Sequence, residues 1–141
     1  MSTKKPISEL SEILSNLNPI LHRGSYVYCS LPSEEACTGI HLTSWIQEDE
    51  GLSVIVEKHI ADQQGWVHSA AMAWITLNVY SSLEAVGLTA KVSSLLAENG
   101  ISCNLVAGYH HDHIFVPEHD KEMAMQLLRE LSGQDQNIKS V

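Results

Sequence analysis

The order of hydrophobic patterns between residues 74 and 131 is the feature that most constrains the fold of this chain. Apolar and polar residues first alternate, which is typical of a strand with one buried face. An apolar stripe at helical spacing follows, then two more alternating stretches and a second helical stripe. The predicted elements are strand 74–80, helix 88–99, strand 101–107, strand 113–116 and helix 123–131. This order predicts an α+β fold in which two helices lie on one face of an antiparallel sheet.

Residues that are typical of helix starts and helix ends support the bounds of the predicted helices. Asn99-Gly100 is a typical helix end, because glycine takes the left-handed conformation at no steric cost. Asp120 has the position of an N-cap for the second helix, and Gly133 follows that helix. A short final strand over 137–141 would complete the β-α-β-β-α-β order of ferredoxin-like folds.

The first half of the chain shows fewer elements than a complete unit of this kind. We expect an amphipathic helix over 6–18, strands over 25–31 and 52–56, and a helical turn over 58–64. Residues 42–47 fit either a strand or a helical turn. The sequence therefore predicts a degenerate ferredoxin-like unit in residues 1–68 and a second unit in residues 69–141, with a linker near 65–71.

Several motifs of the second half resemble those of ACT domains, small regulatory modules found for example at the end of aspartate kinases. The resemblance is strongest to small stand-alone proteins with two ACT-like units. It covers roughly residues 71–133, and a shorter similar stretch lies at 48–54 (EDEGLSV) in the first half. It implies tandem ACT-like units, the first of them degenerate. The motifs are 75–77 (ITL), 81–90 (SSLEAVGLTA), 96–101 (LAENGI), 101–104 (ISCN) and 107–117 (AGYHHDHIFVP).

Composition narrows the class of function. The formal net charge is −9, from 8 Lys and Arg against 17 Asp and Glu, and the basic residues are scattered. This argues against a nucleic-acid surface, which needs clustered positive charge. No apolar run is long enough for a membrane span, and the first residues lack a signal-peptide core. Three widely spaced cysteines indicate reduced thiols, so we expect a cytoplasmic protein.

The sequence lacks the common catalytic motifs. GxSxG, a phosphate-binding P-loop and GxGxxG are all absent. We therefore expect a protein that is not an enzyme and that uses no cofactor.

The loop after the first strand of the second half is the first candidate site. In ACT modules this loop and the following helix start often line a ligand pocket, and a helix N-terminus suits a carboxylate. The serine hydroxyls would add donors, and Gly87 would let a ligand approach the backbone. The alternative is that the serines only cap a turn and the glycine only permits a bend. The candidate residues are Ser81, Ser82, Leu83, Glu84, Val86 and Gly87.

Asn104 is a second candidate. In paired ACT units such a strand meets a neighbouring unit with ligand between them, and an amide binds both ammonium and carboxylate groups. Its alternative role is a surface or interface amide bonded to backbone.

Three histidines and a carboxylate form the densest cluster of polar side chains. His110, His111, Asp112 and His113 have types and spacing that would suit Zn²⁺ or Ni²⁺, with a further ligand such as His119. The alternatives are a polar hairpin or side chains that orient a ligand.

These patterns together predict a regulatory protein that binds a small molecule, most plausibly an amino acid, at a domain or subunit interface. A metal-binding protein that uses the His110–His113 cluster and a ligand-free assembly module are the alternative functions. The predicted face with Trp74, Thr76, Asn78 and Tyr80 is half polar, and an edge strand is unpaired. Both favour a homodimer, although the first half could cover the same surface in a monomer.

Overall fold

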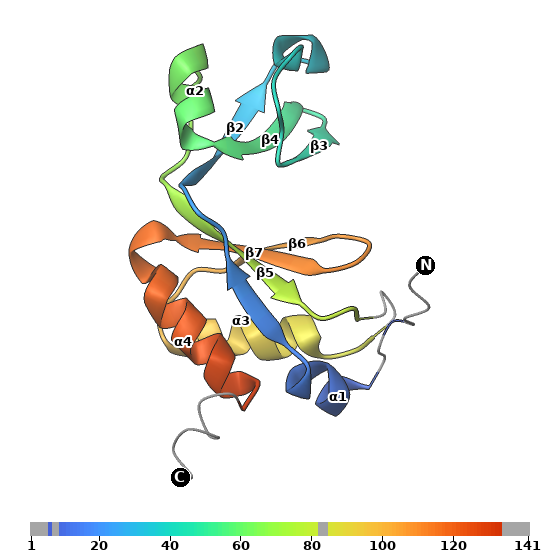
Figure 1. The fold of residues 1–141 in the computed structure, drawn as a ribbon. Helices are drawn as coiled ribbons and strands as arrows, with labels where there is room; N and C mark the ends of the chain where they lie inside the picture. Colours follow the sequence, from blue (N-terminus) through green and yellow to red (C-terminus); the bar gives the residue numbers. More distant parts are fainter. Residues whose placement is uncertain (1–5, 7–8, 82–84, 134–141) are drawn as a thin grey trace. The chain divides into compact units, whose positions relative to one another are not determined.

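A computed structural model describes residues 6, 9–81 and 85–133 (Figure 1). The chain forms two compact units. The smaller unit consists of residues 23–73, and the larger unit combines residues 1–22 with residues 74–141. The first 22 residues thus group with the second half, whereas the boundary predicted from sequence, between residues 68 and 69, follows chain order. In the described part of the chain, no helix is long and apolar enough to cross a membrane.

The larger unit has a sheet with the two helices predicted in the second half of the sequence, and a third, short helix lies before its first strand. Its strand order is β1-β5-β7-β6, and β1 pairs with β5, and β6 with β7, in antiparallel fashion. α3 and α4 lie on one face of this sheet (Figure 1). The strands are β1 (Asn18–Leu21), β5 (Met72–Asn78), β6 (Asn104–Ala107) and β7 (Asp112–Pro117), and the helices are α1 (Leu10–Ser15), α3 (Leu88–Glu98) and α4 (Lys121–Leu131).

The strand that completes this sheet comes from the start of the chain. β1 pairs with β5, with Ile20 opposite Thr76. The helix predicted over 6–18 is wrong in its extent, because α1 covers only Leu10–Ser15 and residue 18 already belongs to β1. Pro19 looks like a break after a helix in the sequence, but a proline is tolerated in a strand at the edge of a sheet. The final strand predicted over 137–141 lies outside the described residues.

The core of the larger unit follows the predicted periodicities. Ile75 and Leu77 are fully buried, as expected for one face of β5. Val92 and Leu96 on α3 are fully buried as well, and so is Leu128 on α4. Sheet and helices therefore share one apolar layer, which fixes the position of the helix start and of the loops at its end.

The smaller unit is a three-stranded antiparallel sheet with one helix. Its strand order is β3-β4-β2, and the start of β5 continues it, with Tyr26 opposite Met72. The segment before β5 extends this edge: the amide of Tyr28 donates to Ser69 Oγ over 2.9 Å, and the amide of Ser69 donates to the Tyr28 carbonyl over 3.0 Å. The elements are β2 (Tyr26–Leu31), the 3₁₀ turn η1 (Glu34–Cys37), β3 (Ser44–Glu48), β4 (Gly51–Glu57) and α2 (Lys58–Gln64).

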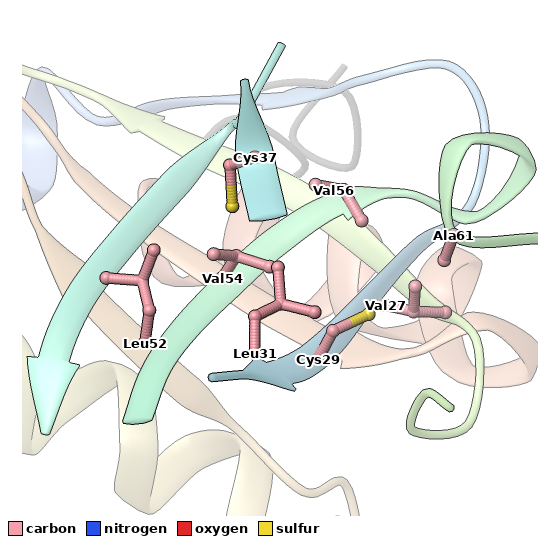
Figure 2. Packing of buried hydrophobic residues seen from close by; sticks show 8 residues of the cluster. All are labelled: Val27, Cys29, Leu31, Cys37, Leu52, Val54, Val56 and Ala61. Carbon is pink, nitrogen blue, oxygen red and sulfur yellow. The ribbon is translucent and has the colours of Figure 1, made fainter. Parts of the chain in front are cut away.

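Alternate residues of β2 and β4 form the core of this unit. Figure 2 shows these side chains together with Cys37 and with Ala61 of α2. In the register, Cys29 lies opposite Val54, and both are buried. The other cross-strand pairs of this core are Val27 with Val56 and Leu31 with Leu52.

The smaller unit is degenerate in a specific way. In place of the helix that joins the first two strands of a ferredoxin-like unit, it has only the turn η1. The undecided stretch 42–47 is largely strand β3. The fold class is therefore α+β with tandem ferredoxin-like units, the first of them degenerate, as predicted.

Candidate functional site

A cavity of about 420 Å³ opens in the larger unit between the start of α3 and the turn that joins β6 to β7. Its walls are the end of the β5–α3 loop, the first turn of α3, the end of β6 and the start of β7. Most of the lining side chains are small, so backbone groups border much of the space. The lining residues are Ser81, Ala85, Gly87, Leu88, Thr89, Ala90, Ala107, Gly108, His111 and Asp112.

One wall of the cavity is the N-terminus of α3. Gly87 is the N-cap residue, with φ of +110°, and no side chain in the described part of the chain caps this end. The carbonyl of Gly87 accepts the first bond of the helix, from the amide of Lys91 over 2.9 Å. The amides of residues 88–90 precede that bond, so they have no acceptor within the helix. They lend this wall partial positive charge.

Asp112 contributes a carboxyl group to the lining. Burial raises the pKa of Asp112, and the neighbouring His111 partly counteracts this effect. The ring of His111 approaches the carbonyl of Val79 with Nδ1 at 3.5 Å. The cavity therefore combines a donor wall of backbone amides with an acceptor wall formed by Asp112.

The structure brings together four of the residues singled out in the sequence. Ser81, Gly87, His111 and Asp112 all line this cavity. Val86 does not line it, and its side chain is 83% exposed. The candidates Ser82, Leu83 and Glu84 lie outside the described residues.

Two further candidates lie elsewhere. Asn104 is exposed on β6, and its Nδ2 donates to the carbonyl of Phe115 over 3.4 Å. His110 is exposed beside the cavity, with its ring 5.5 Å from that of Tyr80 and 5.0 Å from that of Tyr109.

The geometry of the histidine cluster does not favour metal binding. Within residues 6, 9–81 and 85–133, no group of three or more His, Cys, Asp or Glu side chains is arranged to hold a metal ion. The reason is that β7 alternates its side chains between two faces. Asp112 lines the cavity, whereas His113 joins a separate hydrogen-bonded group.

His113 lies in a group of polar and aromatic side chains on the sheet. Its Nδ1 is 3.1 Å from Trp74 Nε1 and 3.0 Å from Thr76 Oγ1. Thr76 Oγ1 also lies 2.6 Å from His22 Nε2. The His22 ring stacks on the Trp74 indole, with centroids 3.6 Å apart and planes 10° from parallel.

Sequence reasoning missed part of both groups of residues. Thr89, Ala90, Ala107 and Gly108 line the cavity, yet small residues carry no chemical signal in a sequence. The motif 107–117 of the resemblance contains Ala107 and Gly108, so this motif was the signal in the sequence that could have identified these two residues. His22 could not be found, because only the pairing of β1 with β5 brings it to Trp74.

Comparisons with known proteins agree with this fold. Two models of the ACT domain family match the chain, one over residues 5–73 and the other over residues 70–130. A crystal structure from Vibrio cholerae, described as a protein of unknown function and possible transport protein, is 40% identical. The match covers 87% of this chain and 95% of that chain, with a TM-score of 0.80. Comparison with curated proteins returned no match.

More distant structures show the same fold. A protein from Agrobacterium tumefaciens is 22% identical over 82% of this chain and 89% of its own, with a TM-score of 0.67. The regulatory subunit of aspartate kinase from Thermus flavus is 14% identical over 82% of this chain and 95% of its own, with a TM-score of 0.62. The two family matches, which together extend over residues 5–130, show that the chain belongs to the ACT-domain family.

Proposed function

We propose that this protein is a non-catalytic regulatory protein of the cytoplasm that binds a free amino acid in the cavity beside α3. The observation that carries the proposal is that the first turn of α3 and Asp112 line the same cavity. Membership of the ACT-domain family and the likeness to aspartate kinase regulatory subunits support a regulatory, ligand-binding role.

The two walls suit the two charges of an amino acid. The free amides at the start of α3 would receive the ligand carboxylate, as helix N-termini do for anions generally. The carboxylate of Asp112 would receive the ligand ammonium group through a charge-assisted hydrogen bond. A cavity of about 420 Å³ lies in the range of small-molecule pockets and can hold an amino acid.

The surroundings of the cavity favour a second copy of the chain as its cover. Val86 directly precedes Gly87, and Tyr109 directly follows Gly108; both glycines line the cavity. The side chains of Val86 and Tyr109 are 83% and 71% exposed. Apolar side chains at such exposure are a frequent feature of protein interfaces. In this proposal a second copy of the chain closes the cavity in a homodimer. The bound ligand stabilises one arrangement of the packed units, and a partner protein recognises that arrangement.

A thermal-shift screen of the purified protein against the common amino acids, with and without chelator, tests the proposal. A ligand at about 100 times its dissociation constant adds about 2.7 kcal/mol of stability, so a selective rise in melting temperature is expected. Light scattering coupled to size-exclusion chromatography should show a dimer in the presence of that ligand. No shift with any amino acid would contradict amino-acid binding, and loss of stability with chelator would instead favour a metal-binding protein.

A further inference from the structure

The Trp74 indole fixes the role of Nδ1 in the hydrogen bonds around His113. An indole N–H can only donate, so Nδ1 of His113 accepts from Trp74 and carries no proton. Thr76 Oγ1 lies 3.0 Å from the same nitrogen and 2.6 Å from Nε2 of His22, and its one hydroxyl proton can point to either ring. When that proton points to His113, Nε2 of His22 donates to Thr76; when it points to His22, Nε2 of His22 accepts. In both arrangements Nδ1 of His113 is an unprotonated acceptor for Trp74.

Protonation of His113 would break this arrangement. Nδ1–H would face the Trp74 indole N–H at 3.1 Å, and two donors cannot bond to each other, so the ring would have to turn or shift. A proton on His22 has no such effect, because Nε2–H can donate to Thr76 Oγ1 and the charged ring can remain stacked on the indole. The arrangement is therefore sensitive to one histidine rather than to both.

The other edge of the His113 ring borders the cavity wall. A Cβ atom placed on Gly108 would lie 3.3 Å from His113 Nε2 and 3.6 Å from its Cδ2. Gly108 lines the cavity, and its amide donates to the carbonyl of His111 over 2.8 Å, which closes the turn. A ring that leaves Trp74 would therefore displace the turn that holds His111 and Asp112.

Burial and two neighbouring imidazoles oppose the protonation of His113. Burial lowers its pKa first, and the imidazoles of His111 and His22 lower it further. β6 contributes the apolar Val106, which is the register partner of His113, and β5 contributes the neutral Trp74 and Thr76. The adjacent carboxyl group of Asp112 lines the cavity on the other face of the strand.

We infer that His113 is a positioning residue that makes the affinity of the cavity depend on pH: its neutral form holds the 108–112 turn in the binding geometry, and its protonation releases that turn. This inference rests on the proposed function, because it concerns the same cavity. Only the neutral fraction would be competent to bind, so affinity should fall about tenfold for each pH unit below the pKa of His113.

The test begins without any ligand. Imidazole ¹⁵N and ¹³C spectra across pH 4.5–8 report the tautomer and the pKa of each histidine. The inference expects His113 to carry its proton on Nε2 and to titrate below the ordinary pKa of about 6.5. A proton on Nδ1 at neutral pH, or titration at or above 6.5, would overturn it whether or not any amino acid binds.

The second part uses the amino acid found by thermal shift and the variant His113→Asn. Asparagine keeps an acceptor near the position of Nδ1 but cannot be protonated in this range. At pH 7.5 the affinity of His113→Asn should be close to that of the wild type. The wild-type affinity should fall at lower pH with a midpoint at the pKa of His113, and this fall should be absent in the variant. His119→Asn, on a histidine that is 82% exposed, is the matched control and should leave the pH profile unchanged.

The outcomes separate the two proposals. An unchanged pH profile in His113→Asn would overturn the positioning role and leave amino-acid binding intact. If no amino acid binds at any pH, the proposed function fails, and with it the coupling of His113 to that site. If His113→Asn does not fold, His113→Gln provides a second neutral side chain with an acceptor, and the ligand-free titration of the wild-type protein still decides the protonation state.

Discussion

Gly87 lies so close to Leu10 that a Cβ atom on Gly87 would come within 2.9 Å of the Leu10 Cδ2 atom. The contact joins the N-cap of α3 to the first residue of α1. It therefore links the candidate site to the segment 1–22, which packs with the second half of the chain. A bulky residue at Gly87 would therefore disturb the fold as well as the cavity.

The first prediction concerns Gly87→Ala. The variant should lose stability through its φ of +110°, at about 1–3 kcal/mol, and lose more through the Leu10 contact. Gly100→Ala is the matched control, since Gly100 has φ of +73° but no atom within 4 Å of its added Cβ. Urea unfolding should show the larger loss for Gly87→Ala, and adding Leu10→Ala should recover part of the difference. Equal losses at both glycines would contradict the role of Leu10.

The second prediction separates the two units. Leu17 and Leu52 are almost fully buried, in the larger and smaller unit respectively. Leu→Ala at each should cost about 2–5 kcal/mol through the cavity it leaves. Hydrogen exchange should increase mainly in residues 74–131 for Leu17→Ala and mainly in residues 26–64 for Leu52→Ala. Faster exchange in residues 26–64 with Leu17→Ala would contradict the assignment of the first 22 residues to the larger unit.

The third prediction concerns the ligand ammonium group. Asp112→Asn should weaken binding of the amino acid about 10- to 100-fold, the equivalent of the about 1.5–3 kcal/mol of a hydrogen bond to a charged group. The corresponding 2-hydroxy acid lacks the ammonium group, so its weaker binding should change little in the variant. Calorimetric titration of both ligands measures the effect, with Asp49→Asn in the exposed β3–β4 turn as control. An equal loss for both ligands would show that Asp112 does not bind the ammonium group.

The fourth prediction concerns stability and pH. Burial lowers the pKa of His22 and the pKa of His113, and the neighbouring imidazoles of His111 and His22 lower the pKa of His113 further. The unfolded chain then binds more protons than the folded chain below about pH 6.5, so these groups destabilise the fold as pH falls through that window. His68 acts in the opposite direction, because hydrogen bonds to Ser69 and Asp62 raise its pKa and favour the folded state at low pH.

Single variants separate these opposing contributions. His113→Asn should show a smaller loss of unfolding free energy between pH 7.5 and 5 than the wild type. His68→Asn should show a larger loss, because it removes the stabilisation that His68 provides when protonated. Urea unfolding at each pH measures both. A steeper decline in His113→Asn would reverse the predicted sign for that residue.

Local patterns were enough to predict most elements of the second half. α3 and α4 follow from their apolar stripes, and β5 follows from its alternation, because each of these elements buries one face. The four-residue strand β1 could not be predicted in the same way. It contains Pro19, and its place depends on pairing with a strand more than fifty positions away in the chain, as Ile20 with Thr76 shows.

The site could be predicted only in part for a similar reason. Gly87 and Asp112 stand out in the sequence because of their motifs, but their position on two walls of one cavity depends on tertiary packing. His113 was grouped with His111 by its spacing. The pleat of β7 instead places the His113 ring within hydrogen-bonding distance of Trp74 and Thr76.

The most direct test of amino-acid binding beside α3 is an NMR titration of the ¹⁵N-labelled protein with the amino acid that raises its melting temperature most. The amide signals of residues 88–90 should shift downfield as they donate to the ligand carboxylate, together with signals of residues 107–112. Saturable shifts confined to other parts of the chain, or no shifts at millimolar ligand, would contradict the proposed site.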